Sequence, residues 1–104
     1  MDISENIKEL NSRIKAKYPD FRGSYLFGSY ARGDFHKDSD IDIVLLFDEK
    51  HDYDEEKNIF GLIGDLDYKC DFILMPITYT MKELKRNNVF HDEVVNKGIY
   101  YDAA

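Results

Sequence analysis

Residues 26–47 read LFGSYARGDFHKDSDIDIVLLF, and the features that decide the fold lie in this stretch. Gly28-Ser29 ends a short apolar segment, and ten residues later Asp40-Ile41-Asp42 begins an apolar run that continues to Phe47. Carboxylates two residues apart on a strand project to the same face, where they repel unless a cation lies between them. Such oxygen ligands suit Mg²⁺, and a glycine turn with a hydroxyl can contact phosphate through its N–H groups. The pattern therefore predicts metal-assisted chemistry on a nucleotide.

The same residues resemble the G-S-x10-D-x-D signature of the DNA polymerase β-like nucleotidyltransferase superfamily. The Ala31-Arg32-Gly33 that follows the Gly-Ser pair is similar to its minimal nucleotidyltransferase (MNT) branch. The resemblance is strongest over residues 24–47, weaker over 68–75 and general in the flanking helices. It implies an α+β protein with the polymerase β-like nucleotidyltransferase fold, in which helices pack against a small mixed β-sheet.

The resemblance also implies roles for particular residues. Asp40, Asp42 and Asp71 would be the catalytic carboxylates and would hold two Mg²⁺ ions. Asp71 is the acidic residue placed to act from the strand after the D-x-D strand, where it would complete one metal site and orient the acceptor hydroxyl as a base. Gly28 and Ser29 would hold the β- and γ-phosphates of the nucleotide, ATP.

The sequence leaves two possible roles open for each of two further polar residues in this region. Arg32 would contact a phosphate, or it would form a surface salt bridge with Asp34 or Asp38. Ser39 would cap the entrance of the strand or touch the shell of the metal.

Hydrophobic periodicity, glycines, prolines and caps predict the order of helices and strands. The first two strands should be antiparallel, and residues 40–75 should form a parallel strand–helix–strand crossover that brings Asp71 beside Asp40 and Asp42. The expected elements are a helix over 3–17, a strand over 24–27, a brief helix over 29–32, a strand over 40–47, a helix over 54–66, a strand over 68–75 closed by Pro76, a helix from Thr80 to Asn87, a helix over 89–97 capped by Gly98, and a short strand over 99–101.

Composition narrows the class of protein. A chain of 104 residues with 43% hydrophobic residues predicts one domain, 1–104. The sequence shows neither a signal peptide nor an apolar stretch of membrane-spanning length, so we expect a cytoplasmic protein with no membrane partner. Cys70 is the single cysteine, and the three histidines have no ligand spacing, so these histidines are expected at the surface. The net charge of −7 argues against nucleic acid as a partner.

The predicted reaction is in-line attack by an acceptor hydroxyl on the α-phosphorus of an NTP. Proteins similar to this one act as antitoxins beside a helical HEPN-type RNase toxin, and some transfer AMP to a tyrosine of that toxin. The resemblance thus implies a HEPN-type toxin as partner. Two alternatives stay open: a non-catalytic module that silences its partner by binding, and an enzyme for a small hydroxyl compound with its acceptor site at an oligomer interface. The acidic loop 48–56 is interpreted as a solvated surface, or as a surface for a basic partner.

Overall fold

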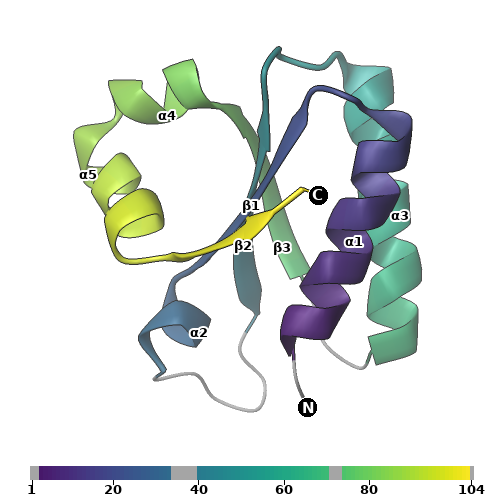
Figure 1. Cartoon of the computed structure of the whole chain (residues 1–104), viewed down its shortest axis with the longest axis horizontal. Helices are drawn as coiled ribbons and strands as arrows, with labels where there is room; N and C mark the ends of the chain where they lie inside the picture. Colours follow the sequence, from purple (N-terminus) through teal and green to yellow (C-terminus); the bar gives the residue numbers. More distant parts are fainter. Residues whose placement is uncertain (1–2, 34–39, 71–73, 104) are drawn as a thin grey trace.

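The computed structural model describes residues 3–33, 40–70 and 74–103, with only the backbone for 29–30 and 66–70 (Figure 1). The described elements are α1 (Ile3–Lys17), β1 (Phe21–Phe27), α2 (Ser29–Arg32), β2 (Ile41–Phe47), α3 (Tyr53–Cys70), β3 (Leu74–Thr80), α4 (Met81–Arg86), α5 (Asn88–His91), the π-helix η1 (Asp92–Asn96) and β4 (Ile99–Asp102). Among the described residues, no helix has both the length and the apolar character needed to cross a membrane.

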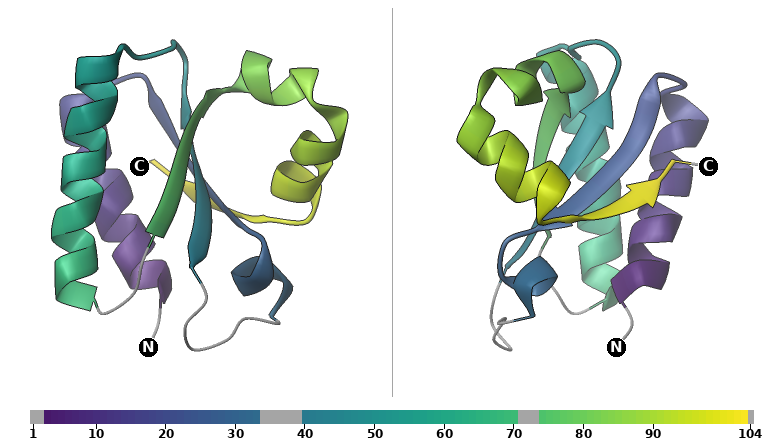
Figure 2. Two further views of the ribbon diagram at one scale, coloured as in Figure 1. Left: turned by 180° about the vertical axis from the view of Figure 1, so that it is seen from behind. Right: turned by 60° about the vertical axis from the view of Figure 1, so that its left-hand side comes forward.

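The four strands form one mixed sheet in the order β3-β2-β1-β4. β1 pairs antiparallel with β2 and with β4, whereas β2 and β3 are parallel. Helices α1 and α3 lie side by side on one face of the sheet, and α4, α5 and η1 lie toward the other face (Figures 1 and 2). The predicted α+β class, the antiparallel first pair and the parallel crossover are confirmed.

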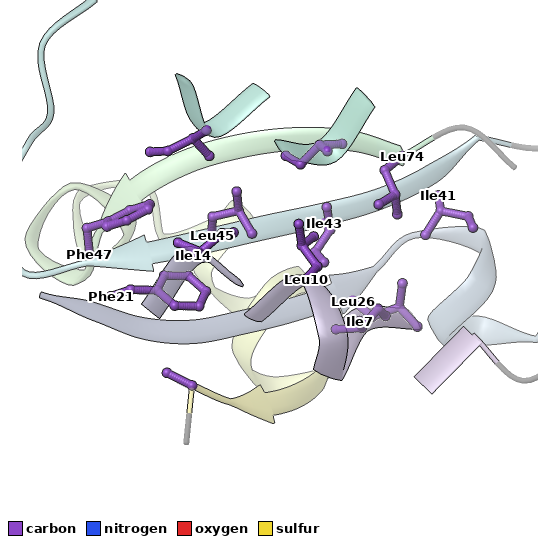
Figure 3. Packing of buried hydrophobic residues seen from close by; sticks show 13 residues of the cluster. Ile7, Leu10, Ile14, Phe21, Leu26, Ile41, Ile43, Leu45, Phe47 and Leu74 are labelled. Carbon is purple, nitrogen blue, oxygen red and sulfur yellow. The ribbon is translucent and has the colours of Figure 1, made fainter. Parts of the chain in front are cut away.

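Strand β2 forms the centre of the core because both of its faces are covered, as its apolar run predicts. Ile41, Ile43 and Leu45 pack beneath α1 and α3 in the larger cluster (Figure 3). Val44 and Leu46 point to the other face and pack with residues of α4 and η1, among them Leu84 and Val94. Alternation along the strand therefore places Asp42 on the same face as Val44 and Leu46.

The predicted third strand is wrong in its position. Residues 68–70 belong to α3, which continues to Cys70, and β3 runs from Leu74 to Thr80. Pro76 lies within this strand opposite Ile43 instead of closing it. The proline is tolerated because β3 is an edge strand, which has no partner on one side within the described sheet. Asp71, predicted on this strand, lies outside the described residues.

The remaining boundaries differ less. α1, α2 and the capping box at Thr80 are as predicted. β1 begins at Phe21, three residues before the predicted start, because a register shift between Phe21 and Gly23 lets the strand continue. Gly23 has a φ of 131°, and a Cβ there would lie 2.5 Å from the carbonyl oxygen of Tyr101. Only glycine fits this close approach of β1 to β4.

One buried polar side chain joins the first helix to the last strand. Asn11, which is 1% exposed, donates from Nδ2 to the carbonyl oxygens of Tyr101 and Asp102 at 3.1 Å each. Its Oδ1 accepts from the buried hydroxyl of Ser24 at 2.9 Å. Asn11 of α1 thus satisfies polar groups of two other elements, β1 and β4.

We predict that Asn11→Ala lowers the free energy of unfolding by about 2 kcal/mol. The substitution leaves the buried Ser24 hydroxyl without its acceptor and removes the donor to two carbonyl oxygens. Urea unfolding followed by circular dichroism measures this loss. Asn58→Ala is the matched control, since Asn58 is exposed on α3 and alanine is the better helix former. An equal loss in both variants would contradict the role given to Asn11.

Candidate active site

The end of β1 and the start of β2 bring the glycine turn against the carboxylate pair. Phe27, the last residue of β1, pairs with Asp42, so the chain enters the turn at Gly28 directly beside this carboxylate. The amide of Arg32 donates to the carbonyl of Gly28 at 3.1 Å, and this bond forms the turn of α2. Asp40 is exposed and immediately precedes β2.

Gly28 is required by two independent features of this turn. Its φ of 73° lies in the left-handed region, which side chains disfavour. A Cβ at Gly28 would also lie 2.5 Å from Oδ2 of Asp42, far closer than real Cβ contacts. The carboxylate of Asp42 therefore rests against the backbone of the turn that the sequence predicts to hold phosphate.

The electrostatics of the pair disfavour its negative charge. Partial burial raises the pKa of Asp42 above its ordinary value, and the charge of Asp40 raises it further. The guanidinium of Arg32 acts in the opposite direction. Burial and the charge of Asp40 therefore favour the protonated form of Asp42, and a positive charge nearby favours its carboxylate form.

Arg32 has a partner that the sequence does not indicate. Its Nη1 lies 3.2 Å from Oε1 of Glu93 in η1, 61 residues further along the chain. The predicted surface partners, Asp34 and Asp38, lie outside the described residues. No local signal could have found Glu93, because the contact depends on how the C-terminal helices fold back beside α2.

Five of the predicted site residues lie in the described part of the chain. Gly28, Asp42, Asp40 and Arg32 come together at one end of the sheet, and Ser29 is described by its backbone as the first residue of α2. Asp71 and Ser39 lie outside the described residues. Among the residues that are described, no group of three or more histidine, cysteine or acidic side chains is arranged to hold a metal ion.

His51 lies at the opposite end of β2 and corrects the expectation of a surface histidine. Its side chain is 9% exposed, between Asp20 at 3.2 Å and Glu55 at 3.0 Å. The ring also packs against Tyr18 and Phe47. The spacing of the histidines does not reveal this arrangement, because Asp20 and Tyr18 come from the distant connection between α1 and β1.

Comparison with known proteins agrees with the fold and the motif. A family model described as "Nucleotidyltransferase domain" matches residues 7–101. A relative from Methanocaldococcus jannaschii, named "Putative protein adenylyltransferase MJ0141", is 37% identical over 100 residues, which cover 95% of this chain and 98% of the relative. A second protein from that organism, with the same description and the designation MJ0604, is 35% identical over 102 residues, covering 94% and 96%.

Solved structures give the same result. A crystal structure described as a toxin-antitoxin with AMP-PNP has a TM-score of 0.66 and 26% identity, over 93% of this chain and 70% of that chain. A crystal structure from Sulfolobus solfataricus has a TM-score of 0.62 at 21% identity, over 95% and 78%, and shows the shared fold. The chain belongs to the nucleotidyltransferase domain family. It is a nucleotidyltransferase, and the resemblance to the minimal nucleotidyltransferases is confirmed.

We predict that Gly28→Ala reduces nucleotide transfer more than about tenfold, because the added methyl group displaces Asp42 from the turn. Gly33→Ala is a matched control: its φ of 80° imposes similar backbone strain, but a Cβ there meets nothing within 4 Å. Both variants should lose about 1 kcal/mol of folding free energy. Equal activities of the two variants in a transfer assay would show that the contact with Asp42 does not matter.

We also predict a pH-dependent stability difference for Asp42→Asn. Because the folded state raises the pKa of Asp42, wild type loses stability as the pH rises through that pKa, whereas the amide does not titrate. Without divalent metal, the variant should melt at a higher temperature than wild type at pH 7. The difference should vanish below about pH 3, where the carboxyl is protonated in both folded and unfolded chains. Thermal melts across this range test the sign; a less stable variant at pH 7 would contradict it.

Proposed function

We propose that this nucleotidyltransferase transfers AMP from Mg²⁺-ATP to a hydroxyl group of a partner protein, a tyrosine of a HEPN-type toxin, and so acts as an antitoxin. The observation that carries the proposal is the contact between Gly28 and Asp42, which joins a phosphate-binding turn to a metal-binding carboxylate. The protein acceptor is supported by the names of the M. jannaschii relatives, and the toxin by the toxin-antitoxin structure with AMP-PNP.

The carboxylates present fit Mg²⁺. Asp40 and Asp42 offer hard oxygen donors, and the raised pKa of Asp42, caused by burial and by the charge of Asp40, supports a cation beside it. Asp71 is proposed as the third ligand, three residues before Leu74, which pairs with Ile41 at this end of β2. When bound, two Mg²⁺ ions would activate the attacking oxygen and stabilise the charge of the leaving pyrophosphate.

The groups of the chain itself would then position the reactants. Gly28 keeps the turn open so that backbone N–H groups at the start of α2 can reach the triphosphate, with the hydroxyl of Ser29 as a further donor. Arg32 would add a positive charge for the phosphates beside Asp42. Asp71 would orient the acceptor hydroxyl as a base. Catalysis by this site would consist of positioning and charge stabilisation.

The net charge of −7 supports a protein acceptor over a nucleic acid, because a polynucleotide would need basic surface to replace its counterions. The carboxylates Asp40 and Asp42, which we propose as catalytic, lie beside the turn at Gly28, and this supports an enzyme over a module that only binds. Whether the partner is neutralised by modification or by complex formation is decided by the following experiment.

We predict that incubation with ATP, Mg²⁺ and the purified product of the adjacent gene adds AMP to a tyrosine of that product. Intact-mass measurement detects the adduct, and peptide mapping locates it. The double variant Asp40→Asn with Asp42→Asn should reduce the rate of transfer more than about 100-fold. Removal of a group that only hydrogen-bonds to a metal ligand has a smaller effect. Mg²⁺-ATP should raise the melting temperature of wild type and not of this double variant.

Two outcomes would contradict the proposal. Neutralisation of the partner by the double variant, with no adduct from wild type, would support the binding module. Transfer to small hydroxyl compounds but not to the partner would support the small-molecule enzyme. Ser29→Ala serves as a graded control, since the neighbouring N–H groups would still contact phosphate and the loss should be smaller.

A further inference from the structure

The register of the sheet sets Asp42 between the phosphate turn and the edge strand. Phe27 of β1 pairs with Asp42 on one side, and Met75 of β3 pairs with it on the other. Phe27 packs with Val44 and Leu46 on the face toward α4 and η1, so all three paired residues share this face. Gly28 follows Phe27 directly. The turn, the carboxylate and Met75 therefore form a row across three strands.

The geometry of in-line transfer determines from which side of Asp42 the acceptor hydroxyl approaches. The attacking and leaving oxygens lie on opposite sides of the α-phosphorus. If the turn at Gly28 holds the β- and γ-phosphates, pyrophosphate leaves on the β1 side of Asp42. The acceptor hydroxyl must then approach from the β3 side. This step rests on the proposed function, because it takes the phosphates to be held at Gly28.

The β3 side is open and apolar. Met75 is 47% exposed and Ile77 is 39% exposed on the face that carries Asp42. Two residues further on, Tyr79 packs against Phe90 of α5 with their ring centroids 5.5 Å apart. The C-terminal helices thus cover the far end of β3 and leave Met75 and Ile77 uncovered beside the carboxylate. These two residues are called the β3 patch.

The apolar surface continues around the edge of the sheet. On the other face of β3, Leu74 and Pro76 line a hollow with Phe60, Ile63 and Gly64 of α3. Phe60 is 42% exposed there. Pro76 has no N–H to donate, so the edge resists pairing with a strand from another molecule. A partner at this edge is therefore held by side chains and not by extension of the sheet, which argues against a second copy adding its own β3.

We propose that the β3 patch docks the partner protein that carries the acceptor hydroxyl, through an apolar surface of that partner bordered by basic side chains. The apolar contact matches Met75 and Ile77. The basic border matches the exposed Asp40, which precedes the pair Ile41–Leu74 at this end of the sheet, and the net charge of −7. Docking here delivers the hydroxyl to the side of Asp42 that in-line attack requires.

The acidic loop 48–56 is the competing surface for a basic partner, and its position disfavours it. The loop follows the last residue of β2, roughly 20 Å along the strand from Asp42. Several of its carboxylates already have partners within the chain. Arg22 binds Asp48 through two hydrogen bonds of 2.7 and 2.6 Å, and Glu56 accepts from the hydroxyl of Thr78 at 2.9 Å. The sequence-based alternative of a solvated surface fits this loop better.

The test replaces the β3 patch with neutral polar side chains, so that the charge beside Asp42 does not change. Met75→Gln with Ile77→Gln is compared with Tyr53→Gln, which removes another exposed apolar side chain, 76% exposed at the start of α3. The probe is the purified product of the adjacent gene. Measured quantities are the Kd of the complex without ATP, the KM and kcat for the partner, and the melting shift with Mg²⁺-ATP.

The double variant should raise Kd and KM for the partner by at least about tenfold, as expected for loss of central apolar contacts. Its kcat at saturating partner and its melting shift with Mg²⁺-ATP should equal those of wild type. The control Tyr53→Gln should leave Kd, KM, kcat and the melting shift unchanged. An unchanged KM and Kd would overturn the docking role. Loss of kcat or of the nucleotide shift would overturn it too, because the residues would then serve the nucleotide.

Failure of the proposed function has a different signature. If wild type binds the partner and transfers no AMP to it, the adenylyltransferase proposal fails. The Kd measured without nucleotide then still decides whether the β3 patch holds the partner: a value raised only in the double variant supports the surface, and equal values in all three proteins overturn it.

Discussion

The close approach of Gly28 to Oδ2 of Asp42 is the constraint on which the site depends. It favours glycine at the turn, because the positive φ strains any side chain and a Cβ there would displace the carboxylate of Asp42. It also fixes the register of β1 against β2, since a slip of one residue would turn the carboxylate to the face of α1 and α3. That face is filled by Ile41 and Ile43, so the hydrophobic core holds the geometry of the candidate site in place.

Much of this arrangement could be predicted from the sequence because the signals are local. The apolar run after Asp42 predicts a central strand, the stripe of α1 predicts a buried helix face, and Thr80 with Glu83 predicts a helix start that the structure forms as a capping box. The third strand was mispredicted for an equally local reason. Pro76 is a strong signal for the end of a strand, and it fails here because β3 lies at the edge of the sheet.

Contacts made between distant segments could not be predicted. Arg32 meets Glu93 only because η1 returns beside α2, and Asn11 reaches β4 only because the last strand pairs with β1 next to α1. The exposed position of Met75 and Ile77 likewise depends on where the C-terminal helices stop covering the sheet. Short stretches of sequence contain none of this information, because each contact depends on how distant segments pack together.

The pKa values of carboxyl groups are shifted in opposite directions at the two ends of the sheet, and this difference distinguishes the end that carries the candidate site. Hydrogen bonds from Arg22 lower the pKa of Asp48, and a hydrogen bond from His51 lowers that of Glu55, so these carboxylates are stabilised as anions within the chain. At Asp42 the pKa is raised, first by burial and then by Asp40. An added positive charge beside Asp42 and Asp40 would relieve their repulsion at neutral pH, as the guanidinium of Arg32 already does in part, and this supports the proposed cation site at this end of the sheet.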